Sequence, residues 1–94
     1  MATITVPGLR KAVKEHFEWQ GDRCGHAVKI VQNIKSGYKM VLVRFTDAQG
    51  NKLSGFMTYQ EWNDGHCDVT EAYVFRRECE DANIEVFRKS QDYV

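Results

Sequence analysis

The stretch of residues 39–46 reads Lys39-Met40-Val41-Leu42-Val43-Arg44-Phe45-Thr46 and carries the clearest strand signal in the chain. Its four consecutive apolar residues, Met40 to Val43, put apolar side chains on both faces of a strand, which is typical of a central strand in a sheet. Residues 47–51 have the composition of a turn, and residues 53–59 are predicted to return antiparallel to the first strand. The middle of the chain therefore predicts a β-hairpin that contains a central strand.

An amphipathic helix is predicted before this hairpin, over residues 8–20. Its apolar face has the spacing i, i+3, i+4, i+7 and i+8, and consists of Leu9, Ala12, Val13, His16 and Phe17. Charged residues occupy the opposite face. Pro7 suits the first helical turn, where its missing N–H costs nothing, and Gly21 is a stop signal.

Two further segments carry mixed signals. In residues 27–35 the apolar residues fit a helical stripe, but the density of β-branched residues and the turn at Ser36-Gly37 favour a strand. Thr58-Tyr59-Gln60-Glu61 has the form of a capping box, which predicts a short helical turn at residues 58–62. Asn63-Asp64-Gly65 is expected to end that turn.

The last third of the chain has two apolar groups, residues 73–75 and 84–87, on either side of the polar residues 78–83. β-branched and aromatic residues dominate both groups, so two strands joined by an acidic turn are predicted, with a helix over 70–79 as the alternative. The 94 residues thus predict one α+β domain. In it, an N-terminal amphipathic helix packs on a four- or five-stranded antiparallel sheet with a short helical turn near 58–62.

The composition is that of one globular domain, and its balanced charge does not favour a strongly charged partner. Hydrophobic residues make up 43% of the chain, which is enough for one core, and the 13 basic residues balance the 13 acidic ones. This balance argues against both a strongly basic nucleic-acid binder and an acidic mimic of DNA. Residues 1–44 carry eight basic and three acidic side chains, and residues 45–94 carry five and ten. If the two halves form different faces, the molecule has one basic and one acidic surface.

The sequence also predicts a cytoplasmic protein without a cofactor. No secretory leader and no apolar run of membrane-spanning length are recognised. Cys24, Cys67 and Cys79 then indicate reduced thiols. Cys24 and Cys67, with His26 and His66, have ligand types that Zn²⁺ accepts, but the spacing is wrong for the familiar zinc fingers, so no metal is expected. Neither a nucleophilic set nor a phosphate-binding loop is found, which predicts a protein that is not an enzyme.

One segment resembles a known kind of sequence. The resemblance is carried by Val28-Lys29-Ile30, residues 41–45, Asp47, Gly50 and residues 59–65. Together these resemble a short β-rich repeat of phage and other mobile-element proteins, often found beside nuclease domains, over residues 26–66. Asn63, Asp64 and Cys67 depart from the repeat, because lysines and a small apolar residue are usual there. The resemblance therefore implies a mobile-element source without the nucleic-acid role of those lysines.

Non-enzymatic protein binding is the predicted function, and the resemblance makes a phage-type inhibitor of a host or defence complex the concrete version. Aromatic and arginine side chains dominate interface hot spots, and a surface of mixed charge suits a protein partner. The predicted partner-binding residues are Tyr59, Trp62, Arg76, Arg77, Glu80, Asp81 and Arg88. The alternatives are a nucleic-acid-binding module and a small zinc-dependent protein. The sequence leaves open whether the protein is a monomer or a dimer.

Overall fold

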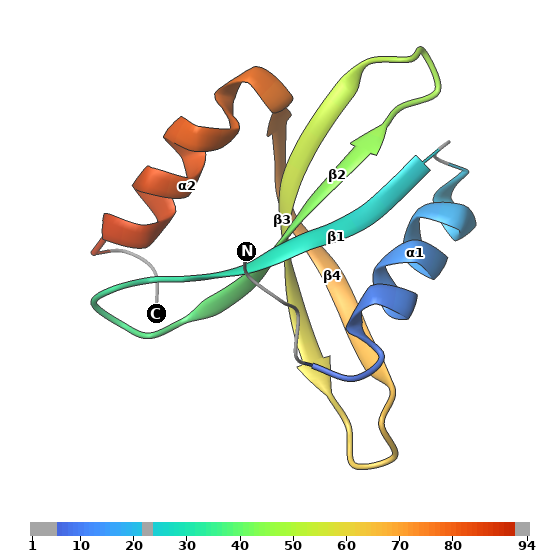
Figure 1. Ribbon diagram of the computed structural model, residues 1–94, viewed down its shortest axis with the longest axis horizontal. Helices are drawn as coiled ribbons and strands as arrows, with labels where there is room; N and C mark the ends of the chain where they lie inside the picture. The colour runs from blue at the N-terminus through green and yellow to red at the C-terminus, as the bar shows by residue number, and fades with distance from the viewer. Residues whose placement is uncertain (1–5, 22–23, 92–94) are drawn as a thin grey trace.

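The computed structural model describes residues 6–21 and 24–91. Helix α1 (Leu9–Gln20) precedes four strands, which are β1 (Cys24–Gln32), β2 (Lys39–Thr46), β3 (Lys52–Glu61) and β4 (Cys67–Arg76). A 3-10 turn, η1 (Arg77–Cys79), then leads into helix α2 (Glu80–Lys89). The strands form one antiparallel sheet in the order β1-β2-β3-β4, so β2 lies inside the sheet as predicted (Figure 1). The predicted α+β class, the N-terminal helix and the central hairpin are confirmed.

The two helices cover opposite faces of the sheet (Figure 1). Val41, Val43 and Phe45 of β2 belong to the α1 core, which also contains Leu9, Val13, Phe17, Ala27, Met57 and Cys67. Met40 and Leu42 belong to the α2 core, which also contains Val31, Phe56 and Phe87. Successive side chains of a strand point to opposite faces, so an unbroken apolar run is required where both faces are covered. The composition of β2 therefore follows from one helix on each side.

A β-bulge explains the mixed signal in residues 27–35. The register of β1 against β2 shifts between Ala27 and Lys29, which leaves Val28 as an extra residue. Ala27 and Ile30 consequently pack with the α1 core, while Val28 and Val31 pack with the α2 core. The bulge resets the two-residue alternation, and the apolar positions then imitate a helical stripe. The predicted strand is confirmed, and it runs from Cys24 to Gln32.

The predicted helical turn at 58–62 is wrong. Strand β3 continues to Glu61 and pairs with β4, from Thr58 opposite Thr70 to Glu61 opposite Cys67. The reversal comes later, where the Trp62 N–H donates to the His66 carbonyl at 2.9 Å. A capping box requires residues 58–61 to adopt helical backbone angles, whereas pairing with β4 holds them in the extended conformation. The pairing with β4 therefore outweighs the local helix-start motif.

The predicted strand at 84–87 and the acidic turn at 78–83 are also wrong, because these residues belong to η1 and α2. The alternative helix over 70–79 is wrong as well, since β4 extends to Arg76. Glu80, Ile84 and Phe87 recur at i, i+4 and i+7, which puts them on the face of α2 that meets the sheet. Acidic residues in the first turn of α2 and basic residues in its last turn also match the helix dipole.

Candidate functional site

The predicted partner-binding residues do not form one surface. Tyr59 is half-buried against the α1 core, and Trp62 lies at the β3–β4 turn. Arg76 lies opposite Leu53, at the other end of the same hairpin from Glu61 and Cys67. These two ends are eight residues apart on β3, roughly 26 Å at about 3.3 Å per residue. Arg88 is at a third place, the last turn of α2.

Trp62 belongs to a small polar cluster at the β3–β4 turn. Its indole Nε1–H donates to the Asp68 carboxylate at 2.7 Å, and its ring stacks on the His66 ring at a centroid distance of 6.1 Å. His66 in turn contacts the Asp64 carboxylate, and hydrogen bonds from the backbone and side chain of His66 lower the pKa of Asp64. The Trp62 side chain remains 44% exposed. Its polar contacts hold the ring against the turn and leave part of its surface to solvent.

Glu80 and Arg77 have structural contacts rather than open surface positions. The Glu80 carboxylate accepts hydrogen bonds from Arg44 Nε at 3.0 Å, from Arg44 Nη2 at 2.6 Å and from the Ser54 hydroxyl at 2.6 Å. The hydrogen bonds from Arg44 hold the pKa of Glu80 below its ordinary value. The Arg77 Nη2 donates to the carbonyls of Phe45 and Leu53 at 3.1 and 3.2 Å. The two side chains therefore fix η1 and α2 to the β2–β3 hairpin.

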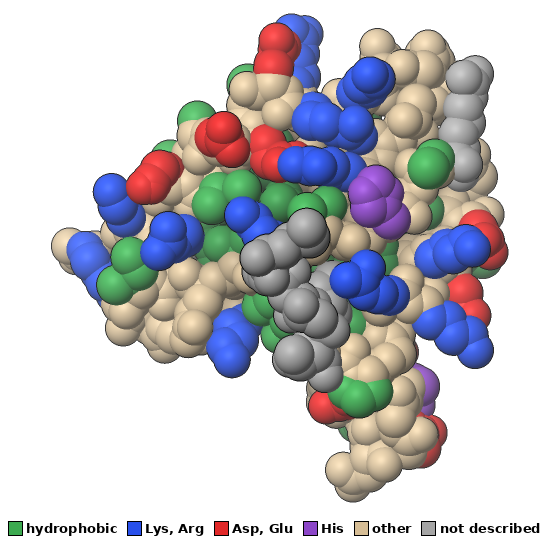
Figure 2. All heavy atoms as spheres, viewed as in Figure 1, with side chains coloured by type: hydrophobic (Ala, Val, Ile, Leu, Met, Phe, Trp, Pro, Cys, Tyr) green, Lys and Arg blue, Asp and Glu red, His purple; other side chains and the backbone are tan. Residues whose placement is uncertain are grey.

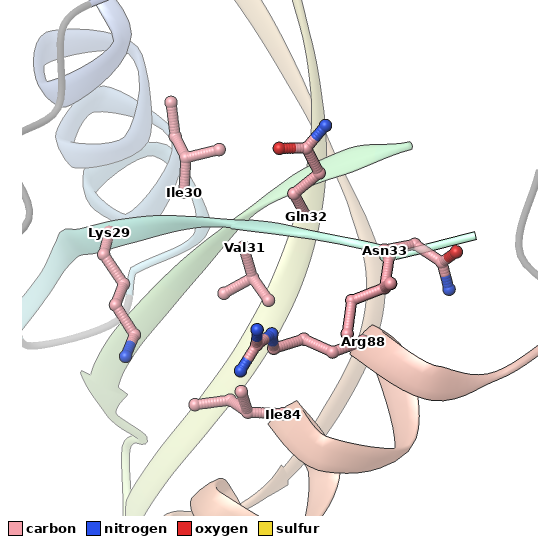
Figure 3. Close-up of a pocket in the computed structure, with 8 residues that line it drawn as sticks. Lys29, Ile30, Val31, Gln32, Asn33, Ile84 and Arg88 are labelled. Carbon is pink, nitrogen blue, oxygen red and sulfur yellow. The ribbon is translucent and has the colours of Figure 1, made fainter. Parts of the chain in front are cut away.

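A groove of about 490 Å³ runs between β1 and α2 (Figure 3). Its lining consists of the six consecutive residues 29–34 together with Ile84 and Arg88 of α2. A strand face contributes only every second residue to a surface, because side chains alternate between faces. Residues 29–32 are four consecutive residues of β1, and they can border one space only where the backbone edge itself forms part of the wall; Asn33 and Ile34 continue this wall beyond the end of the strand. The groove thus exposes the edge of β1.

Asn33 closes the groove at one end and fixes the helix to the strand. Its buried side-chain amide donates to the carbonyls of Phe87 and Ser90 at 2.7 and 2.9 Å. Its Oδ1 accepts the backbone N–H of Lys35 and of Ser36 at 2.9 and 2.8 Å. The Ile34 N–H adds a bond to the Arg88 carbonyl at 2.8 Å. One asparagine therefore shapes the β1–β2 turn and also ties it to the end of α2.

Two cations and several apolar side chains line this groove. Lys29 from β1 and Arg88 from α2 both extend into the space between the two elements (Figure 3). Neither side chain has an ion-pair partner among residues 6–21 and 24–91. Ile84 and the largely buried Val31 form an apolar strip, and Ile34 is 62% exposed at the end where Asn33 lies. The groove therefore combines a strand edge, an apolar strip and two cations that no carboxylate of the described residues pairs with.

The condition for one basic and one acidic surface, that the two halves of the chain form different faces, is not met in the described residues. Helix α1, from the basic half, packs on β4 as well as on β1, and Arg44 pairs with Glu80 of the acidic half. Figure 2 shows Lys and Arg side chains over much of the viewed face, with Asp and Glu among them over α2. Hydrophobic side chains are visible between α2 and the sheet. The surface is mixed in charge because the two halves of the chain intermingle.

The two cysteine and histidine pairs lie at opposite edges of the sheet, one pair in β1 and the other where the β3–β4 turn meets β4. Cys24 and His26 are exposed in β1, whereas Cys67 is buried at the start of β4 and contacts the Pro7 carbonyl at 3.2 Å. Burial raises the pKa of the Cys67 thiol, which keeps it protonated. Within the described part of the chain, no group of three or more His, Cys, Asp or Glu side chains is arranged to hold a metal ion.

Among the residues that line the groove, only Arg88 belongs to the predicted partner-binding set. Lys29, Asn33, Ile34 and Ile84 were missed as site residues, although the Ser36-Gly37 turn next to Asn33 is visible in the sequence. An open strand edge leaves no sequence signal until the order of the strands is known.

Comparison of the chain with protein-family models, with curated proteins and with solved structures finds no match. None of the helices within residues 6–21 and 24–91 combines the length and the apolar character needed to span a membrane.

Proposed function

We propose that this chain is a non-enzymatic binding module that holds a segment of a partner protein in the β1–α2 groove. The observation that carries the proposal is the row of six consecutive residues, 29–34, along one side of the groove. A strand edge presents unpaired backbone N–H and C=O groups, which a polypeptide partner can satisfy. The bonds from Asn33 to the end of α2 hold the groove in shape before a partner arrives, which lowers the ordering cost of binding.

The mixed surface charge favours a protein partner over nucleic acid. A phosphate backbone requires a continuous field of cations, and on this chain carboxylates lie among the cations over α2 (Figure 2). The concrete form of the proposal, a phage-type inhibitor that occupies the surface of a host or defence complex, rests on the sequence resemblance of residues 26–66. A protein that acts by occupying a surface needs no catalytic set.

The test compares two apolar side chains of equal exposure. Ile34 borders the groove, and Val86 lies on α2 outside its lining; each is 62% exposed. A protein captured by the wild-type chain from the source host is identified by mass spectrometry, purified, and titrated against Ile34→Asp and Val86→Asp. We expect Ile34→Asp to weaken binding by about tenfold or more, and Val86→Asp to remain close to wild type.

Two results would contradict the proposal. If Trp62→Ala abolishes binding while Ile34→Asp does not change it, the partner surface is the β3–β4 turn. If the captured molecule is DNA or RNA and binding falls steeply with salt, the chain is a nucleic-acid-binding module. Circular dichroism of each variant establishes that a lost interaction does not come from a lost fold.

A further inference from the structure

The outer edge of β1 has the geometry to accept one more strand. β2 is the only strand that pairs with β1 in the part of the chain that the structure describes. The Asn33 N–H donates to the Tyr38 carbonyl at 2.8 Å across the β1–β2 turn. Backbone groups of an antiparallel pair alternate between the inner and outer edge, so Gln32 and Ile30 turn their N–H and C=O groups outward. These outward groups border the groove.

The groove also selects side chains on the added strand. Lys29 lies opposite Leu42, and Val31 lies opposite Met40, so both point to the face that α2 covers. Residues directly opposite on paired strands have neighbouring side chains on the same face. A strand added to β1 therefore places one side chain beside Lys29 and another, two residues away, beside Val31 and Ile84. The first position favours a carboxylate, and the second favours an apolar side chain.

Arg88 strengthens the selection for negative charge. Its guanidinium extends from α2 into the same space as the Lys29 ammonium group (Figure 3). Neither cation has a carboxylate partner among the described residues. A partner's carboxylate placed between them would form charge-assisted hydrogen bonds. A second copy of this chain would instead bring its own Lys29 and Arg88 to the edge, and repulsion between like charges opposes that pairing.

We infer that the β1–α2 groove binds an extended acidic segment of a protein partner by strand addition, with an acidic and an apolar residue two positions apart. This inference rests on the proposed function and specifies its partner. The bulge at Val28 and the bond from Ile34 to Arg88 limit the ladder to the short run between them. Short ladders give weak binding, so the occupant is a segment of a larger protein whose further contacts add affinity.

The probe is a short labelled peptide, Thr-Thr-Glu-Thr-Val-Thr-Thr, and its control has Gln in place of Glu. Binding is followed by amide chemical shifts of the protein in a titration. We expect shifts centred on residues 29–34 and on α2, and an affinity about tenfold lower for the Gln peptide. Lys29→Gln and Arg88→Gln should each remove that preference for Glu, while Arg10→Gln, on the exposed side of α1, should keep it.

Backbone methylation of the peptide tests the strand geometry. Successive N–H groups of the bound peptide point alternately toward β1 and toward solvent. N-methylation should therefore abolish binding at the positions that face β1 and leave binding unchanged at the positions between them. Equal affinity for the Glu and Gln peptides, or a methylation profile without alternation, would overturn the inference. So would a protein dimer that Lys29→Gln dissociates, because the occupant would then be a second copy.

The two proposals fail in different ways. If neither peptide binds but the natural partner still loses affinity with Ile34→Asp, the groove binds protein by another mode, and only strand addition is refuted. If the natural partner binds Ile34→Asp and wild type equally, the proposed function fails whatever the peptides do.

Discussion

Replacing Glu80 by Ala tests whether the ion-paired cluster beneath α2 determines stability. Glu80 is 7% exposed, and its carboxylate accepts three hydrogen bonds, two from Arg44 and one from Ser54. Its neighbour Asp81 is exposed, so Asp81→Ala is the matched control on the same helical turn. Both residues look alike in the sequence, and their environments predict very different costs.

The magnitude follows from what the substitution leaves behind. The Ser54 hydroxyl is fully buried, and leaving it without this partner costs about 1–2 kcal/mol. The Arg44 side chain is 39% exposed, so water can replace part of the hydrogen bonding that it loses with the carboxylate. Loss of the ion pair is therefore expected to cost about 1–2 kcal/mol, less than the loss of a fully buried pair. We therefore expect Glu80→Ala to lower the free energy of unfolding by about 2–4 kcal/mol. Asp81→Ala should change it by less than about 0.5 kcal/mol.

Urea unfolding followed by circular dichroism measures both changes at pH 7. The Glu80 carboxylate has a lowered pKa in the folded protein, so its stabilising effect is present above its ordinary pKa of 4.5. That effect is lost as the pH falls through the lower folded pKa. Stability of the wild type should consequently fall more steeply on acidification than stability of Glu80→Ala. Equal costs for the two variants at pH 7, or parallel pH profiles, would refute the assignment of Glu80 to a buried ion pair.

Three further predictions concern packing and the Asn33 clamp. Leu42→Ala should cost about 2–4 kcal/mol in urea melts, because Leu42 is fully buried in the α2 core, and an unresolved change in midpoint would contradict its central place. Asn33→Leu removes the hydrogen bonds to the carbonyls of Phe87 and Ser90 and should lower the free energy of unfolding by about 2–4 kcal/mol. Amide hydrogen exchange in the last turn of α2 should become faster, and an unchanged exchange rate would show that Asn33 does not hold the helix. Gly25→Ala places a Cβ 2.1 Å from Cδ2 and 2.3 Å from Cγ of Phe17, so thermal melts should show a loss of about 1–3 kcal/mol. Phe17→Ala removes both of these atoms, so its cost should be smaller in the Gly25→Ala background than in the wild type, whereas additive losses would argue against this clash.

The sequence alone determined the elements whose signals are local and repeated. Leu9, Val13 and Phe17 recur with the helical period, and Gly21 follows as a stop signal. Helix α1 can therefore be predicted without knowing which elements pack against it. The unbroken apolar run Met40–Val43 likewise predicts a central strand, because only a strand between two covered faces requires apolar side chains on both sides.

The tertiary structure decided the segments whose conformation depends on a distant partner. Residues 58–61 are a strand because β4 pairs with them, and the sequence motif for a helix start cannot report that partner. Glu80 is buried because Arg44 and Ser54, 36 and 26 residues away, satisfy its charge. The groove exists because β1 is at an edge of the sheet in the part of the chain that the structure describes, and α2 lies beside that edge. Strand order and ion pairing are long-range choices among many compact arrangements, and local propensity, being short-range, does not distinguish them.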